Sequence, residues 1–363
     1  MTEVSTDKVS PAEPAGDAST GPLLETKNLT QHFRVGRGFS RKMLHAVDDV
    51  NLTVERQEIV ALAGESGSGK STIARLLAGV YQPTSGEIYY QGRPVSAMRS
   101  RREQLAYRGD VPMVFQDPFS SLNPAFRVSH GILRSLKLHN RELTRDQRYD
   151  EAARVVEQVG LAPAADILHR YPYELSGGQR QRIGFAQALA HQPKLILADE
   201  PVSMLDVSIR IGLLNLMAEL RESAGVSFLY ITHDIASARY VADRLMIMYA
   251  GHIVESGPAE SVLANPKHPY TDLLLGAVPD PRAPLSVGVE GDTGEPPKVI
   301  DPAPGCRFRW RCPLAIDECH HITPKLRLLG ERHTAACHVA QPDPGFASPD
   351  PVATPAEPDG GKN

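Results

Sequence analysis

GESGSGKST, at residues 64–72, decides the fold of this chain. The stretch fits the phosphate-binding pattern G-x4-G-K-[ST]. The positions that this pattern requires are occupied by Gly64, Gly69, Lys70 and Ser71. An apolar run at 58–64 leads into the loop, and apolar residues at helical spacing follow it at 73–77. A strand, a glycine-rich turn and a helix N-terminus in that order direct backbone amides at one anion, so the sequence predicts a nucleotide-binding α/β protein.

The loop supplies a complete set of phosphate ligands. Its small residues let the backbone approach an anion, Lys70 reaches the outer phosphates, and the hydroxyl of Ser71 ligates magnesium. The residues expected to bind ATP here are Gly64, Ser66, Gly67, Gly69, Lys70, Ser71 and Thr72. A solvated Gly-Ser turn is the alternative interpretation, and the flanking strand and helix argue against it.

The rest of the chain alternates short apolar runs with helical patterns, which favours an α/β core. We expect buried strands at 58–64, 111–117, 195–201 and 226–234, and antiparallel edge strands at 50–55 and 86–92. From 129 to 190 only helical spacing is found. The predicted divisions are a disordered tail at 1–22, a nucleotide-binding domain at 23–262 with a helical insertion at about 118–190, a cysteine-bearing extension at 263–340 and a Pro/Asp-rich disordered tail at 341–363.

The composition excludes several classes of protein. Of the 363 residues 41% are apolar and 23% charged, as in globular proteins, and a net charge of −4 provides no overall basic field for nucleic acid. We expect no nucleic-acid partner. The longest apolar stretches fall short of a bilayer span, and the first residues lack the pattern of a signal peptide, so we expect neither a membrane crossing nor export.

Three further segments carry chemistry. In LILADE, at 195–200, Asp199 is expected to hold magnesium through water and Glu200 to act as general base, although a solvated strand-end acid is the alternative. His233 ends another apolar run and could contact a γ-phosphate. LSGGQ, at 175–179, opens an apolar helix, which predicts a second anion site unless the segment is only a helix cap.

Together these motifs resemble those of ABC-type ATPases, the nucleotide-binding subunits of ATP-binding cassette transporters. The loop at 64–72 corresponds to Walker A, LILADE to Walker B, LSGGQ to the signature and SMLDVS, at 203–208, to the D-loop. The resemblance implies that two cassettes pair head to tail, so that the signature of one closes over nucleotide held by the other. It assigns the signature contacts to Ser176, Gly177, Gly178 and Gln179, magnesium and water sensing to Gln116, the dimer seam to Asp206, the switch to His233 and adenine stacking to Phe33.

A finer resemblance, over residues 23–340, points to the oligopeptide and dipeptide importer branch. It rests on VFQDPFSSLNP (114–124), NPKHPYTDLLL (265–275) and GCRFRWRCPLAIDEC (305–319). It implies a peripheral ATPase on the cytoplasmic face of the membrane, two permeases and an extracytoplasmic solute-binding protein. Gln187 and Met204 depart from the branch pattern, which favours a different chain as the partner cassette. Importers of oligosaccharides or metal chelates, and a soluble non-transport ABC ATPase with a redox-sensing cluster, are the alternatives.

The four cysteines lie close together in the sequence, with the spacing C-x5-C-x6-C-x17-C. They are Cys306, Cys312, Cys319 and Cys337. A reducing cytosol disfavours disulfides, and the gaps exceed those of common zinc sites, which favours an iron-sulfur cluster. The resemblance points to a 4Fe-4S cluster, and zinc bound with help from His320, His321 or His338 is the alternative. We expect this group to be structural and to lie away from ATP.

Overall fold

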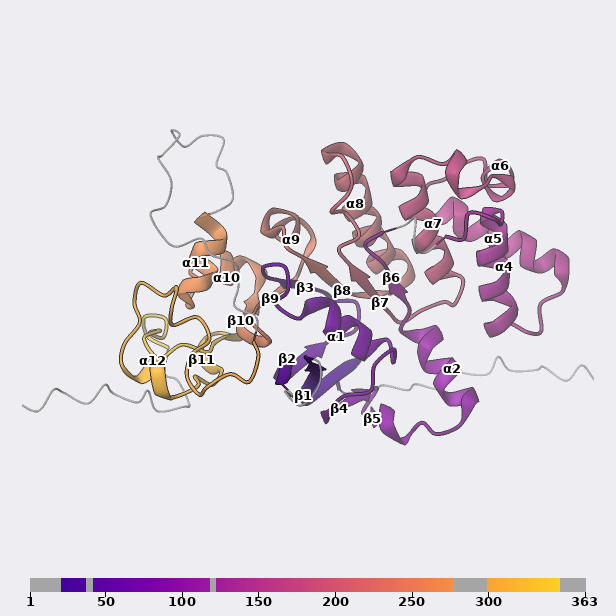
Figure 1. Ribbon diagram of the computed structural model, residues 1–363. Coiled ribbons are helices and arrows are strands. Elements are labelled where there is room, and N and C mark those ends of the chain that lie inside the picture. Colours follow the sequence, from indigo (N-terminus) through magenta and orange to yellow (C-terminus); the bar gives the residue numbers. More distant parts are fainter. Residues whose placement is uncertain (1–20, 37–41, 118–121, 277–298, 347–363) are drawn as a thin grey trace, which may run out of the picture.

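The computed structural model of the chain describes residues 21–36, 42–117, 122–276 and 299–346 (Figure 1). Residues 1–20 and 347–363, which make up most of the two predicted tails, lie outside the described residues. The described chain contains two sheets, with helices packed around the larger one. Among its helices, none is long and apolar enough to cross a membrane.

The larger sheet has eight strands in the order β11-β12-β10-β9-β3-β8-β7-β6. Neighbours from β9 to β6 run parallel, and their bounds are Arg244–Tyr249 (β9), Ile59–Ala63 (β3), Ser227–Thr232 (β8), Leu195–Asp199 (β7) and Met113–Val114 (β6). Strands β10 (His252–Pro258), β12 (His333–Ala335) and β11 (Arg327–Gly330) continue the sheet antiparallel. The predicted α/β core with a mixed sheet is confirmed. Strand β6 is shorter than the predicted 111–117, because Pro112 has no amide hydrogen to donate and the chain leaves the sheet after Val114.

The smaller sheet is antiparallel, as the alternating pattern predicts. Its order is β2-β1-β4-β5, with bounds Lys42–Val54 (β2), Leu24–Val35 (β1), Ser85–Tyr90 (β4) and Arg93–Pro94 (β5). It packs beside helix α1 (Lys70–Leu77), and the two share one hydrophobic cluster with the larger sheet. This antiparallel subdomain therefore stands next to the start of the phosphate loop's helix.

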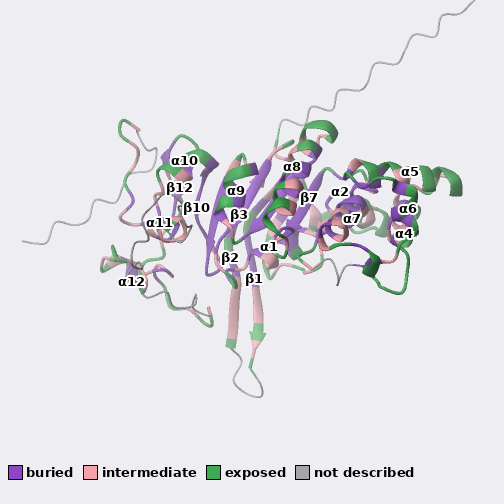
Figure 2. Cartoon of the chain, turned by 90° about the horizontal axis from the view of Figure 1, so that it is seen from above, coloured by how far each residue is buried: buried purple, intermediate pink, exposed green. Residues whose placement is uncertain are grey.

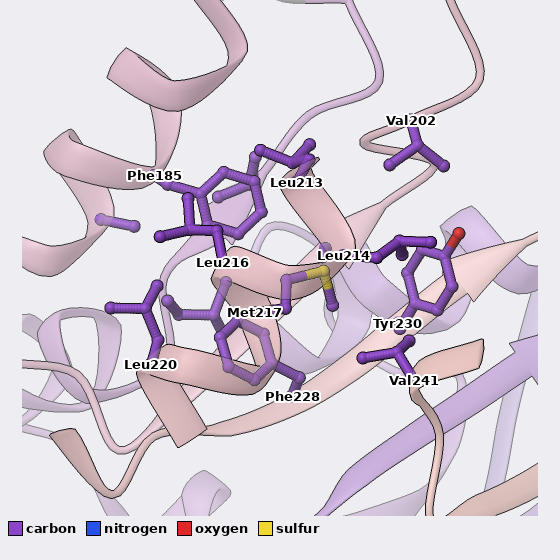
Figure 3. Packing of buried hydrophobic residues seen from close by; sticks show 14 of the residues in the cluster. Phe185, Val202, Leu213, Leu214, Leu216, Met217, Leu220, Phe228, Tyr230 and Val241 are labelled. Atoms are coloured by element: carbon purple, nitrogen blue, oxygen red, sulfur yellow. The ribbon is translucent and has the colours of Figure 1, made fainter. Parts of the chain in front are cut away.

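The central strands are buried on both faces because successive side chains alternate. On β8, Phe228 joins the cluster containing Met217 of α8 (Val207–Ala224), as Figure 3 shows. Leu229 instead joins the cluster containing Ile73 of α1. Burial of each such side chain contributes about 1.5–3 kcal/mol. Figure 2 shows the buried residues concentrated in these strands. The two apolar layers hold the carboxyl ends of the parallel strands in fixed positions.

Between residues 129 and 190 the structure has helices with short loops between them, and no strand. They form a separate group at one side of the molecule (Figure 1). The bounds are α4 Val128–His139, α5 Arg145–Gln158, α6 Ala164–His169 and α7 Gly177–Leu189, with a 3-10 turn at Pro172–Glu174. Gln187, one of the two departures from the branch pattern, packs on Gly131 of α4, so it serves the interior of this group.

The remaining helices lie between the strands in the sequence. They are α2 Arg101–Asp110, α8 Val207–Ala224, α9 Ile235–Val241, α10 Ala259–Ala264, α11 Pro269–Gly276 and α12 Glu318–His321, with a 3-10 turn at Val95–Ala97.

Residues 299–346, here called the C-terminal region, contribute strands β12 and β11 to the larger sheet. Strand β12 pairs with β10, so the sheet continues across the predicted division near Val262. Buried Glu255 on β10 accepts a hydrogen bond from His333 of β12 at 2.7 Å. Asp343, inside the predicted tail at 341–363, pairs with Lys267 at 2.7 Å, so ordered contacts extend past residue 341.

Candidate functional site

The phosphate loop depends on glycine at two close backbone approaches. Gly69 precedes α1 with φ 110°, and a Cβ there would lie 2.1 Å from the carbonyl oxygen of Ala46. Gly64 has φ 153°, and a Cβ there would lie 2.1 Å from the carbonyl oxygen of Met248. Any side chain at either position would collide with backbone, so the loop needs glycine at both. The structure thus places the predicted loop between β3 and α1.

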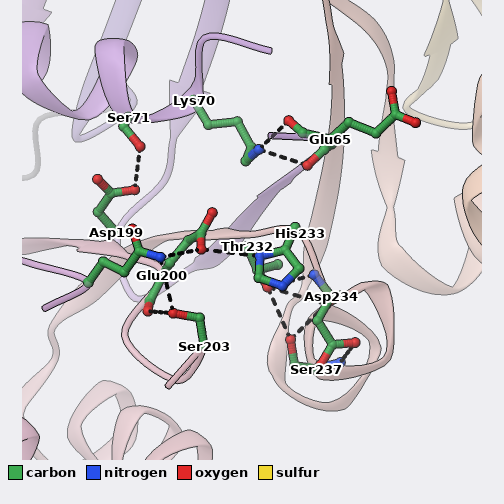
Figure 4. Close-up of polar contacts among 12 residues, drawn as sticks. Glu65, Lys70, Ser71, Asp199, Glu200, Ser203, Thr232, His233, Asp234 and Ser237 are labelled. Carbon is green, nitrogen blue, oxygen red and sulfur yellow. Dashed lines mark hydrogen bonds and ion pairs between the residues drawn. The ribbon is translucent and has the colours of Figure 1, made fainter. Parts of the chain in front are cut away.

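Lys70 is buried inside this loop, with 4% of its surface exposed. Its Nζ donates to the carbonyl oxygens of Gly64 at 2.7 Å and Glu65 at 2.8 Å (Figure 4). Burial lowers the pKa of Lys70, and the charges of Glu200, Asp199 and Glu65 oppose that effect. The Nζ of Lys70 also donates to the Ser68 hydroxyl at 3.4 Å. A buried ammonium whose partners are all neutral oxygens gains strongly from a phosphate oxygen, so the loop suits a polyphosphate.

Ser71 and Asp199 form an oxygen pair at the end of β7. The Ser71 hydroxyl donates to Oδ1 of Asp199 at 2.9 Å, and only 5% of Asp199 is exposed. Burial raises the pKa of Asp199, an effect that the Ser71 hydrogen bond opposes. A buried carboxylate beside a hydroxyl is the donor set that magnesium prefers. These residues therefore fit a magnesium ion between the loop and β7.

Glu200 follows Asp199 in a left-handed conformation with φ 46°, which is strained for a residue with a side chain. Its Oε2 accepts from Gln116 Nε2 at 3.0 Å and lies 3.1 Å from His233 Nδ1 (Figure 4). The structure thus brings together three residues that the sequence places on separate segments. Ser203, which sequence reasoning missed, bonds to the Glu200 carbonyl at 3.0 Å and lies 3.4 Å from Gln116.

The signature segment lies apart from this group, and of its residues Ser176 alone is exposed. Ser176 caps α7: its Oγ accepts from the backbone NH of Gln179 at 3.2 Å, and its own NH donates to the Gln179 side chain at 3.0 Å. Gly177 and Gly178 pack against Leu205 and Ile209. In the described chain, no hydrogen bond joins residues 175–179 to the phosphate loop. Within one chain the signature segment and the phosphate loop are therefore separate groups among the described residues.

Two other predicted site residues occupy accessible positions. Asp206 is exposed at the start of α8, next to exposed Met204. Phe33 is half-buried on β1, and its ring meets that of Tyr81 edge-on at 5.5 Å between centroids. Phe33 is therefore partly accessible, on a strand whose subdomain packs against α1.

The predicted cysteine cluster does not appear as a compact ligand group. All four thiols are free, and across the described residues the one set of three or more ligand atoms within 4.8 Å of one another is His32, His45 and Asp48. A cysteine-rich metal domain is thus not evidenced by the arrangement. The NH of Cys306 donates to the carbonyl of Cys319 at 2.8 Å. The pKa of Cys306 is raised to about 11, mainly by burial and further by the charges of the other three cysteines.

The histidine group around Asp48 was not foreseen from the sequence. Asp48 accepts from His32 at 2.9 Å and His45 at 2.8 Å, and it pairs with Arg307. Burial raises the pKa of Asp48, but bonds from His252 and these three residues outweigh burial and lower it well below its usual range. Because a guanidinium already neutralises this carboxylate, the group ties the C-terminal region to β2 rather than offering a free metal ligand.

Known proteins resemble this chain along most of its length. The family descriptions "ABC transporter" and "Oligopeptide/dipeptide transporter, C-terminal region" match residues 47–203 and 254–319. The chain is 42% identical over 327 residues to the probable peptide ABC transporter ATP-binding protein y4tS of Sinorhizobium fredii, covering 88% of this chain and 90% of that protein. It is 41% identical to the di/tripeptide transport ATP-binding protein DppF of Pseudomonas aeruginosa, covering 88% and 98%.

A solved structure agrees with the fold. The dimeric post-hydrolysis ATP-binding cassette MJ0796, bound to ADP and Pi, matches with a TM-score of 0.58 and 28% identity over 65% of this chain and 99% of that one. The sequence relatives and this fold agree with the site geometry. The chain belongs to the ATP-binding proteins of ABC transporters, in the oligopeptide and dipeptide importer branch.

Proposed function

We propose that this ABC ATPase energises an importer of oligopeptides or dipeptides. It acts from the cytoplasmic face of the membrane with a second cassette, two permeases and an extracytoplasmic solute-binding protein. The observation that carries the proposal is the convergence of Lys70, the Ser71–Asp199 pair and Glu200 at one sheet edge. The match of residues 254–319 and the two peptide-transport relatives support peptides over oligosaccharides and metal chelates.

Binding of ATP uses groups that the loop already presents. The ammonium of Lys70 turns from the carbonyls of Gly64 and Glu65 to the outer phosphates, and the loop amides at the start of α1 receive the others. Ser71 and Asp199, with Gln116, would hold magnesium, whose charge neutralises the phosphates when it is bound. Phe33 would stack on the adenine.

Hydrolysis depends on Glu200. Its carboxylate is oriented by Gln116 and His233, and it accepts the proton of the attacking water as general base. The strained backbone at Glu200 fits this role, because strain persists where the surrounding structure fixes a functional side chain. His233 is half-exposed, so it can turn toward a γ-phosphate while keeping its place beside Glu200.

The second cassette completes each site. Ser176 is exposed at the N-terminus of α7, and the exposed residues Met204, Asp206 and Val207 lie in the neighbouring segment that packs against Gly177 and Gly178. Pairing head to tail buries this surface and brings the signature of one chain to the loop of the other. Met204, a departure from the branch pattern, lies in this exposed segment, which favours a partner cassette with a different sequence.

The test of the ATPase assignment is Glu200→Gln in the assembled transporter, with Glu157→Gln on the exposed face of α5 as control. Loss of the general base should lower kcat by roughly 10²–10⁴-fold. ATP affinity should persist, because Lys70 and the loop are untouched. Near-normal hydrolysis by Glu200→Gln would contradict the assignment. Stimulation of hydrolysis by a binding protein loaded with oligosaccharide but not with dipeptide would contradict the proposed solute.

We also propose that the four cysteines bind a 4Fe-4S cluster in the mature protein. Their free thiols, buried or half-buried in one neighbourhood, support this, since a cubane holds its four thiolates further apart than a single metal ion does. The hydrogen bond from the NH of Cys306 to the carbonyl of Cys319, at 2.8 Å, holds two of the ligating segments together. Zinc with histidine ligands is the alternative.

Anaerobic purification of the full chain distinguishes the two metals. A cluster gives a brown protein with broad visible absorbance and stoichiometric iron and sulfide, and Cys312→Ala should remove the colour. Zinc is d10 and leaves the protein colourless. A colourless chain with one tightly held zinc, and no iron, would therefore overturn the cluster proposal.

A further inference from the structure

The segment between the first two cysteines, residues 306–312, reaches the phosphate loop. The sequence predicts a cysteine group apart from the nucleotide site, yet Arg311, next to Cys312, forms two parallel bonds to Glu65: Nη1 to Oε2 at 2.8 Å and Nη2 to Oε1 at 2.9 Å. Glu65 directly follows Gly64 in the loop. The side chains of Arg311 and Glu65 are 8% and 23% exposed, so water reaches this ion pair only from the side of Glu65.

Glu65 is fixed at its backbone as well. Its NH donates to Tyr270 Oη at 2.8 Å, and its carbonyl oxygen accepts from Lys70 Nζ at 2.8 Å. Figure 4 shows its side chain pointing away from Lys70, toward the outside of the loop. Glu65 is thus held at its NH, its carbonyl and its side chain, and two of the three partners come from segments after residue 268.

Arg311 is itself held by an aromatic platform. Its guanidinium lies 5.8 Å from the ring centroid of Tyr249 and 5.9 Å from that of Phe308, and both rings are almost fully buried. Tyr249 packs in turn on Tyr270 at 4.6 Å between centroids. Stacking of this kind and bidentate pairing fix a guanidinium far better than a lysine could be fixed. The contact with Glu65 is therefore a rigid one.

We propose that Arg311 is a positioning residue for ATP binding, acting through Glu65 on the phosphate loop. The loop is rich in glycine and serine, so its bound shape costs conformational entropy unless other groups hold it. Without Arg311, an unpaired carboxylate would also remain beside the site of a polyanion and repel it. The inference rests on the ATPase activity of the family and not on which metal the cysteines bind.

The test compares Arg311→Met with Arg309→Met in the full-length chain. Arg309 lies in the same segment but bonds only to the Cys306 carbonyl, at 2.8 Å, and stacks on exposed Trp310. We expect Arg311→Met to raise the Kd and KM for ATP about tenfold or more, as for loss of a contact between coupled residues, with a much smaller change in kcat. Arg309→Met should leave Kd, KM and kcat unchanged.

A double-mutant cycle with Glu65→Gln separates positioning from a general loss of stability. If the two residues act as one unit, Glu65→Gln combined with Arg311→Met should be no worse than Arg311→Met alone. A folded Arg311→Met chain with normal Kd and KM, or with a lowered Tm only, would overturn the proposal, as would additive effects. If Arg311→Met does not fold, Arg311→Lys replaces it in the same cycle. We expect its KM for ATP to be raised, but less than tenfold. A KM equal to that of the unsubstituted chain would overturn the proposal.

Discussion

Glu255→Gln should destabilise the whole chain, because Glu255 accepts four bonds at a fully buried position. Its Oε1 receives the NH of Lys267 at 2.7 Å and His333 Nε2 at 2.7 Å, and its Oε2 receives the NH of His268 at 3.0 Å and Thr271 Oγ1 at 2.5 Å. Glutamine turns one of these acceptors into a donor, so two bonds are lost whichever way the amide points. At about 1–3 kcal/mol for each buried polar group left unsatisfied, the expected loss is about 2–6 kcal/mol.

Unfolding in urea or by heat measures this loss, with Glu260→Gln on the exposed face of α10 as control. Trp310 is the only tryptophan in the sequence and lies in the C-terminal region, so its fluorescence reports that region while circular dichroism reports the whole chain. Both signals should shift together by roughly 10 °C, and the control should shift little. A shift confined to fluorescence would refute the reasoning, because it would mean that the C-terminal region unfolds by itself.

Three further outcomes are expected. Lys70→Ala should weaken ATP binding roughly 10–100-fold, since it deletes a charged hydrogen bond to phosphate; titration with a fluorescent nucleotide measures this, and unchanged affinity would contradict the role. Ser176→Arg should block hydrolysis at the site built on the partner's loop yet leave ATP binding by its own loop intact, which mixed dimers can show; full hydrolysis by a monomeric variant would exclude the head-to-tail arrangement. Burial lowers the pKa of His268 to about 4, below an unfolded value near 6.5, so the unfolded chain binds a proton more readily than the folded chain. The free energy of unfolding should therefore be constant above about pH 6.5 and fall by up to roughly 3 kcal/mol toward pH 4. The urea midpoint should depend less on pH in His268→Gln, and an unchanged dependence would contradict this.

The phosphate loop could be predicted from the sequence because its geometry is local. Residues 64–72 need only the preceding strand, the following helix and glycine at close backbone approaches, and all three leave marks in one short segment. The strands β3, β7 and β8 could be predicted equally well, since burial on both faces requires continuous apolar runs. The resemblance then supplied residues with no local signal of their own, such as Gln116.

Contacts between distant segments could not be predicted in this way. The Arg311–Glu65 pair joins residues 246 positions apart, and the Glu255–His333 pair joins residues 78 apart. The sequence around Arg311 or Glu255 does not identify the partner of either residue, because charge alone does not specify which opposite charge lies nearby. Ser203 was missed for the same reason: its hydroxyl becomes informative only when the turn after β7 brings it beside Gln116.

The unbroken sheet from β6 to β11 gives the molecule a natural reference frame. Because β12 is hydrogen-bonded to β10, a spectroscopic label in the C-terminal region travels with the strands that carry Asp199. The helices α4 to α7 contribute no strand to that sheet. Distances from a label on β11 to one on α5 would therefore record rotation of the helical group relative to the catalytic strands, because the label on β11 is fixed to those strands by the sheet.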